Sequence, residues 1–138
     1  MTRSGQPAGR VPVATYRRSE IWWIDFGDPV GHEMGFVHPG VIVSKQDFND
    51  VAARLGWLIV VPGTSTRITV PGTNRILMTH FEVANNKVNG LDHDTYFLCE
   101  QVRFISTVRL QRLIGKLESP HIREIENRLC LVMDLFRR

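Results

Sequence analysis

Hydrophobic residues occur along this chain in short runs separated by turn residues, and only the last segment has helical spacing. Five of these runs are apolar, β-branched or aromatic and end at glycine, proline or polar clusters, which is typical of strands. They cover residues 20–26, 40–44, 57–61, 77–83 and 96–105, and a shorter sixth strand is expected at residues 113–117. The second and third runs are continuously apolar, which predicts burial on both faces of a sheet.

The final segment has a different period. Ser119 followed by Pro120 is a helix-start signal. Apolar residues then recur at spacings of three and four, at Ile122, Ile125, Leu129, Val132, Met133 and Phe136. One amphipathic helix should therefore close the chain. Ser106 or Thr107 can cap a brief helix before the sixth strand.

These elements together predict the fold class. Several short strands, loops containing glycine and proline, and one terminal helix favour a mainly β protein, a small and strongly bent β-barrel with helical additions. A chain of 138 residues can bury one core but is short for two domains. Residues 1–18 lack an apolar period and are rich in Gly, Pro, Ser and Arg, so we expect a flexible basic tail before one domain over residues 19–138.

Charge is distributed unevenly. The formal net charge is +3, but residues 1–18 hold four arginines and no acid, which leaves 13 basic and 14 acidic residues elsewhere. A second acid-free basic segment contains Arg103, Arg109, Arg112 and Lys116. A basic surface must therefore be local, with Arg67 and Arg75 as further candidates. The alternative is that these are ordinary solvated charges.

Other features indicate the compartment. No apolar run approaches the roughly 20 residues that cross a bilayer, and the N-terminus lacks the apolar stretch of a signal peptide. Cys99 and Cys130 lie in a strand-like and a helical pattern, which suggests buried thiols more than a disulfide framework. We therefore expect a soluble cytoplasmic protein that does not contact membranes.

Several short strings occur in a distinctive order. Residues 18–26 are R-S-E-I-W-W-I-D-F, and P-V-G-H-E follows at 29–33. Further strings are P-G-V-I-V-S at 39–44, V-V-P-G-T-S at 60–65, C-E-Q-V-R at 99–103, R-L at 109–110 and I-G-K-L at 114–117. Over residues 18–136 the chain resembles the MazF/PemK family of bacterial toxins that cut single-stranded RNA. That family has R-G-E-I-W-x-V-D, P-x-x-G-x-E, R-P-x-V-V-x-S, V-V-P-x-T-S and E-Q-I-R in the same order.

The resemblance implies both an assembly and a reaction. It implies an SH3-like barrel, a homodimer, RNA bound across the dimer groove, and an antitoxin whose peptide occupies that groove. It also implies cleavage without metal or cofactor, in which the RNA 2′-hydroxyl attacks the phosphate and leaves a cyclic phosphate and a 5′-hydroxyl. Such a reaction needs a base, an acid and hydrogen-bond donors for the phosphate.

The family places these roles on an arginine before the proline of the second strand and on the threonine of V-V-P-x-T-S. Thr64 matches, but His38 stands at the arginine position. Arginine donates a fixed fork of hydrogen bonds at every pH, whereas histidine is smaller and only partly protonated near neutrality. His38 is therefore predicted to act as acid or base, and loss of catalytic power is the alternative. Without the family, a lone histidine in a glycine-rich loop is usually a surface residue.

Three further residues are catalytic candidates. His32 and Glu33 form G-H-E with Gly31, as in some family members where the histidine is implicated in catalysis. Glu100, expected on a strand, can orient His38 or accept a proton. The alternatives are that Glu33 only fixes its loop by hydrogen bonds, and that Glu100 pairs with Arg103 or Arg109 at the surface.

Five residues are assigned to RNA binding: Ser65, Arg67, Phe36, Gln101 and Arg103. The hydroxyls and amides of Thr64, Ser65 and Thr66 suit a phosphate, although such clusters are usually turns. Phe36 is expected to be exposed because it lies in a loop.

Two further interpretations concern the tryptophans and a possible metal site. Trp22, Trp23 and Trp57 can stack on bases, but aromatic residues in strands of a small barrel are usually core. The histidines His32, His38 and His80, with Cys99 and Glu33, lack the short spacings of zinc modules, so no metal site is predicted.

The sequence thus predicts the toxin of a toxin–antitoxin system, an endoribonuclease that cleaves single-stranded RNA such as messenger RNA. The alternative is a catalytically impaired homologue that binds an antitoxin or RNA as a regulatory module. A gyrase-poisoning toxin of the CcdB type has a related fold but does not need the G-x-E and V-V-P-x-T-S strings.

Overall fold

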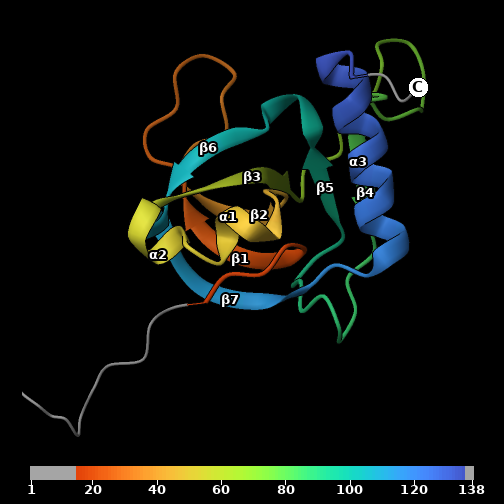
Figure 1. The fold of residues 1–138 in the computed structure, drawn as a ribbon. Helices are drawn as coiled ribbons and strands as arrows, with labels where there is room; N and C mark the ends of the chain where they lie inside the picture. Colours follow the sequence, from red (N-terminus) through yellow and green to blue (C-terminus); the bar gives the residue numbers. More distant parts are fainter. Residues whose placement is uncertain (1–14, 136–138) are drawn as a thin grey trace, which may run out of the picture.

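The computed structural model describes residues 15–135 (Figure 1). Its strands are β1 (Glu20–Asp25), β2 (Val37–Ile42), β3 (Trp57–Thr64), β4 (His80–Val83), β5 (Thr95–Leu98), β6 (Arg103–Ser106) and β7 (Leu110–Lys116). The helices are α1 (Gln46–Asn49), α2 (Ala52–Leu55) and α3 (Ser119–Met133), and the 3₁₀ turns are η1 (Cys99–Gln101) and η2 (Thr107–Arg109). Ser106 caps η2 by accepting a hydrogen bond from the Val108 amide, as the sequence predicted.

The strands form one antiparallel sheet that bends around a core. Its order is β4-β5-β3-β2-β1-β7, and β6 also pairs with β3. The two partners divide β3 between them, because β6 pairs with residues 57–60 and β5 with residues 63–64. The mainly β fold with a terminal helix is therefore confirmed, although the sheet is bent like a barrel without closing (Figure 1).

Two hydrophobic clusters fill the two faces of this sheet. One is shared with α3 and includes Val61 and Phe97, whereas the other lies within the curve of the sheet and includes Val60 and Leu98. Neighbouring residues of one strand therefore enter different clusters, as the alternating geometry of a strand requires. The predicted burial on both faces is confirmed for residues 40–42 and 60–61, whereas Val43, Trp57 and Ile59 are only partly buried.

The terminal helix is also confirmed. α3 packs on η1 and β4, and Figure 1 shows it upright beside β5. Ile122 and Ile125 are buried in the first cluster, and Leu129 and Val132 pack against it. Met133 is about half exposed, and Phe136, the last apolar position of the predicted stripe, lies outside the described residues. Among residues 15–135, no helix has the length and apolar character needed to cross a bilayer.

The predicted strand over residues 96–105 is wrong as a single element. It consists of β5, η1 and β6. The interruption falls where β3 changes partner, next to Val61 and Pro62. Because Pro62 has no N–H to donate, a continuous ladder cannot run through this point. Three further strands have other bounds than predicted, because β2 begins at Val37, β4 at His80 and β7 at Leu110. The helices α1 and α2 were not predicted, since four-residue helices are too short to show a period.

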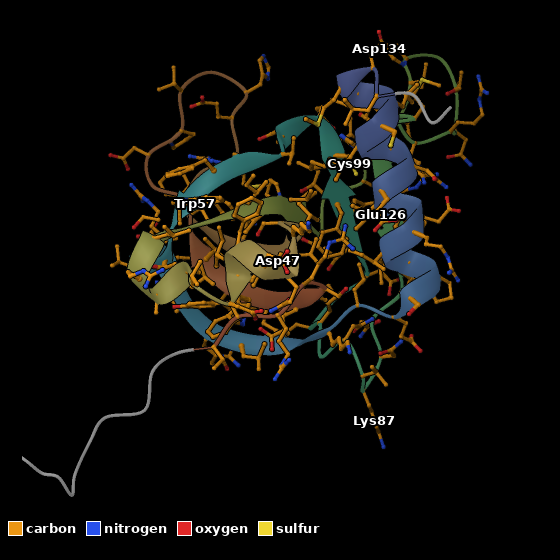
Figure 2. The ribbon with its side chains drawn as sticks, viewed as in Figure 1. Asp47, Trp57, Lys87, Cys99, Glu126 and Asp134 are labelled. Carbon is orange, nitrogen blue, oxygen red and sulfur yellow. The ribbon has the colours of Figure 1, made fainter. Side chains whose placement is uncertain are left out.

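The tryptophans are less buried than expected for core residues. All three are only partly buried. The Trp57 ring has the Phe48 ring 5.6 Å away and the Phe104 ring 5.7 Å away, centroid to centroid, and Figure 2 shows Trp57 on the side of the sheet remote from α3. The core interpretation is wrong for Trp57, because β3 starts at an outer edge that no element covers completely.

Residues just before β1 make contacts with the domain. The Tyr16 and Trp22 rings are 5.6 Å apart, and the Arg18 Nη1 lies 2.7 Å from the Glu126 Oε2 of α3. The predicted flexible tail over residues 1–18 is therefore wrong for its last part, which is bound to the domain. Residues 1–14 lie outside the described part, and for them the basic tail stays a prediction.

Candidate functional site

The loop between β1 and β2 carries three of the predicted site residues, and its own hydrogen bonds close it. The Phe26 amide donates to the Phe36 carbonyl (2.8 Å), and the Phe36 amide donates to the Gly27 carbonyl (2.7 Å). Within the loop, the Glu33 carboxylate accepts a hydrogen bond from the Val30 amide (3.0 Å). Glu33 therefore has the loop-fixing contact that was considered as its alternative role.

The same loop is tied to η1 and β6. The Gln101 side chain accepts from the Met34 amide (2.6 Å) and donates to the His32 carbonyl (3.1 Å). Arg103 donates to the Met34 carbonyl (3.4 Å), and its guanidinium carbon lies 5.4 Å from the centre of the Phe26 ring. Gln101 and Arg103 therefore position the loop, whatever they bind in addition.

This arrangement creates a cavity of about 520 Å³. Five of the predicted site residues line it together with Val102: His32, Glu33, Glu100, Gln101 and Arg103. The lining contains carboxylates, an imidazole, an amide and a guanidinium, so it can both donate and accept hydrogen bonds and can contact a phosphate. The structure thus gathers residues from a loop, a 3₁₀ turn and a strand on one wall.

Glu100 lies on η1, and its partners differ from those expected. Its carboxylate is bound by Thr79 Oγ1 (2.9 Å) and His80 Nε2 (2.9 Å), and neither Arg103 nor Arg109 makes a described ion pair with it. Burial alone would raise the pKa of Glu100, but hydrogen bonds from His80, from the backbone and from Thr79 outweigh burial and lower it. The surface-pair alternative is wrong.

His38 lies in β2 opposite Ile24 of β1. On the other side of β2, the pairing with β3 ends at Gly40 and Pro62, so His38 and Thr64 each lie two residues beyond the last pair. Burial lowers the pKa of His38, because desolvation disfavours the imidazolium. The Thr64 Oγ1 accepts from the Thr66 amide (3.2 Å), so its own proton remains available to a ligand.

A second, smaller cavity of about 200 Å³ opens beside His38. Ser65 lines it, as do Trp23 and His93, two residues that were not assigned to the site. The Arg112 guanidinium carbon lies 5.9 Å from the centre of the Trp23 ring. Arg112 belonged to the basic segment found in the sequence, but no local signal connected it with Trp23.

Two predicted RNA-binding residues line neither cavity. Phe36 is 64% exposed and has a left-handed backbone with a φ of 63°. Arg67, in the segment between β3 and β4, donates to the side chain and the carbonyl of Asn74 (3.2 and 2.6 Å). The expected exposure of Phe36 is confirmed, but these contacts bring neither residue to Glu100 or His38.

Thr79 and His80 bind the Glu100 carboxylate, and neither was predicted as a site residue. His80 was considered only as a metal ligand, and Thr79 was not considered. Within residues 15–135, no three His, Cys, Asp or Glu side chains gather closely enough to hold a metal ion.

The chain is similar to known toxins in sequence. Residues 17–133 match the family model described as PemK-like, MazF-like toxin of type II toxin-antitoxin system. The protein named Endoribonuclease MazF9, from Mycobacterium tuberculosis, is 33% identical over 122 residues, which cover 87% of this chain and 98% of that protein.

Solved structures agree with the fold. MazF (Form-I) from Deinococcus radiodurans superposes with a TM-score of 0.68 at 20% identity, over 88% of this chain and 99% of that one. An endoribonuclease in complex with its cognate antitoxin, from a mycobacterial species, gives a TM-score of 0.65 at 17% identity, over 88% and 97% of the two chains. With a family match that spans both cavities and a relative matched over nearly its whole length, this chain belongs to the PemK-like, MazF-like toxins of type II toxin–antitoxin systems.

Proposed function

We propose that the protein is the toxin of a toxin–antitoxin system and an endoribonuclease that cuts single-stranded RNA, including messenger RNA. The observation that carries this proposal is the family match over residues 17–133, together with the relative named as an endoribonuclease. The lining of the larger cavity supports it, because Arg103 suits a phosphate and the carboxylates suit the N–H and O–H donors of a nucleotide.

The proposed reaction is an internal transesterification. The RNA 2′-oxygen attacks phosphorus, the bond from phosphorus to the 5′-oxygen breaks, and a 2′,3′-cyclic phosphate and a 5′-hydroxyl result. His38 accepts the 2′-hydroxyl proton, a role favoured by burial that keeps its imidazole neutral. Thr64 donates its hydroxyl proton to a phosphate oxygen. His32, exposed on the loop, is proposed to protonate the leaving oxygen.

The remaining assignments are proposed on the same basis. Glu33 and Glu100 form the acidic part of the larger cavity. Ser65, Gln101 and Arg103 bind RNA at the two cavities, and Phe36 and Arg67 contact RNA outside them. The reaction needs no metal or cofactor, because the nucleophile belongs to the RNA and side chains transfer the protons.

Partners and location follow from the family. The mycobacterial neighbour is an endoribonuclease bound to its cognate antitoxin. We propose that this chain likewise binds an antitoxin peptide, in the groove of a homodimer, and acts in the cytoplasm where messenger RNA is available.

The test is cleavage of a long single-stranded RNA by the purified full chain in EDTA, followed by mapping of the product ends. Cyclic phosphates and 5′-hydroxyls at a recurrent sequence are expected. The matched control is the variant Thr64→Val, which keeps the shape of the side chain and removes the donor. Wild-type protein that leaves every RNA intact would refute the nuclease assignment.

A second candidate is favoured by one observation, the presence of His38 where the family has arginine. A histidine with a lowered pKa cannot donate two parallel hydrogen bonds to a phosphate as arginine does. The protein would then be an impaired homologue that binds an antitoxin or RNA. Binding of a long RNA without cleavage, with cleavage gained on His38→Arg, would select this candidate.

A further inference from the structure

The carboxylate of Glu100 is held at both oxygens by side chains that come from one short segment. Thr79 donates its hydroxyl proton to Oε1 (2.9 Å), and His80 Nε2 lies 2.9 Å from Oε2. The segment itself is anchored, because the Cys99 amide donates to the Thr79 carbonyl (3.1 Å) and His80 pairs with Leu98 across β4 and β5. Thr79 and His80 therefore set the direction in which the Glu100 carboxylate lies in the larger cavity.

His80 is unusual among the polar residues of the core. It is only 1% exposed, and its carbonyl accepts from Arg128 Nε of α3 (3.1 Å). Its Nδ1 is buried without a hydrogen-bond partner among the described residues. Because an ionised carboxylate only accepts, Nε2 must carry a proton, and Nδ1 is left without a hydrogen-bond partner whether or not it is protonated. An unsatisfied buried polar atom destabilises a fold, so packing alone does not account for an imidazole here.

The charged groups around Glu100 come from several elements. His32 and Glu33 of the loop and Arg103 of β6 line the same cavity, while Arg128 of α3 contacts His80 from behind. Glu100 itself is 37% exposed in its side chain. The pKa of this carboxyl is lowered in spite of burial, chiefly by the His80 hydrogen bond and then by the backbone and Thr79. Glu100 therefore stays ionised throughout the neutral range.

We propose that His80 is a positioning residue of the RNA site: with Thr79, it holds Glu100 as an ionised acceptor that binds a hydrogen-bond donor of the RNA. This inference rests on the proposed function, because it takes RNA as the ligand of the larger cavity. Glu100 then supplies no proton in the reaction. Its two carboxylate oxygens accept hydrogen bonds in fixed directions. They therefore select a nucleotide that presents an N–H or O–H group to Glu100.

The experiment compares four variants of the full chain. His80→Leu removes the donor at similar size, and His80→Gln keeps an N–H near the position of Nε2. Thr79→Val removes the second donor from a partly exposed site, which keeps the test decisive if His80→Leu does not fold. The matched control is His121→Leu, because the Nδ1 of His121 is also buried without a partner and its ring lies 5.7 Å from that of Phe81, yet it makes no described bond to Glu100.

The first readout is the pKa of the Glu100 carboxyl, followed by NMR in each folded variant, and it needs no RNA. His80→Leu and Thr79→Val should each raise this pKa by about one unit, His80→Gln should restore most of the lower value, and the control should not change it. An unchanged Glu100 pKa in His80→Leu or in Thr79→Val would overturn the proposal.

The second readout is cleavage. The kcat/KM of His80→Leu and of Thr79→Val should fall on the order of tenfold or more, with His80→Gln recovering most of the loss. The limb of the pH profile that follows ionisation of Glu100, which is separate from the limb given by His38, should move upward with the Glu100 pKa. If His80→Gln and His80→Leu lower kcat/KM equally and that limb does not move, His80 has only a structural role and the proposal is wrong. If wild-type protein cleaves no RNA, the nuclease assignment fails, and the NMR titration still decides whether His80 controls Glu100.

Discussion

His38 lies opposite Ile24 on the ladder of β2 and β1, whereas the ladder of β2 and β3 ends at Gly40 and Pro62, two residues short of His38 and of Thr64. His38 thus lies in a paired strand and not in a free loop. Its partial burial lowers its pKa. An arginine at this position would carry its charge at every pH, so the substitution changes the chemistry available at this end of β2.

Substitution of His38 should separate the two candidate functions. His38→Ala should reduce RNA cleavage on the order of a hundredfold or more, the usual effect of losing a general acid or base, with RNA binding changed much less. Single-turnover cleavage and filter binding measure the two effects. His38→Arg should impair cleavage if histidine has a specialised role, and should increase it if the site is an impaired form of the family pattern. Unchanged cleavage in His38→Ala would remove His38 from the mechanism.

The pH dependence should identify the protonation state that His38 uses. Because burial lowers its pKa below the ordinary 6.5 or so, neutral imidazole predominates at pH 7. If neutral His38 is the base, the rate rises as the pH increases through the lowered pKa and is level near neutrality. The measurement is single-turnover cleavage between pH 5 and 8, with His38→Arg as the reference that lacks this limb. A rate that falls as the pH increases over the same range would assign His38 as the acid.

Residues 1–14 and Arg18, both within the predicted basic tail, should differ in their effects on stability. Deletion of residues 1–14 should leave the thermal midpoint nearly unchanged, since these residues lack an apolar pattern. Arg18→Ala should cost about 1 kcal/mol or more, because it breaks a partly buried ion pair with Glu126 and a hydrogen bond to the Val43 carbonyl. Arg17→Ala is the matched control, as Arg17 is exposed. Calorimetry that finds a large loss for the deletion would show that the tail packs on the domain.

The protein should be a homodimer at micromolar concentration. Leu131, Met133 and Leu135 each remain about half exposed at the end of α3, which leaves apolar area for a second copy. Light scattering should give twice the mass of one chain. Leu131→Glu combined with Leu135→Glu should raise the dissociation constant by about tenfold or more, since each buried leucine contributes roughly 1.5–3 kcal/mol. Val108→Glu, at an exposed residue of η2, is the control. A monomer mass for the wild type would refute the dimer.

The amino-acid sequence alone determined the first three strands, the terminal helix and the family. The apolar runs at β1, β2 and β3 and the three-and-four spacing of α3 are local patterns, and local patterns follow from strand and helix geometry. The strings around His38, Thr64 and Glu100 indicated the family, because each lies within a few consecutive residues.

Tertiary structure decided what those residues contact. η1 interrupts the fifth predicted strand because β3 exchanges one partner for another at Pro62. Gln101 reaches the Met34 amide across 67 positions of sequence, and His80 reaches Glu100 across 20. No periodicity records such pairs, since they form only when the sheet bends and brings separate segments together. Packing therefore decides which candidates line each cavity, and it brings His80 to the Glu100 carboxylate. Short-range sequence patterns do not encode such packing.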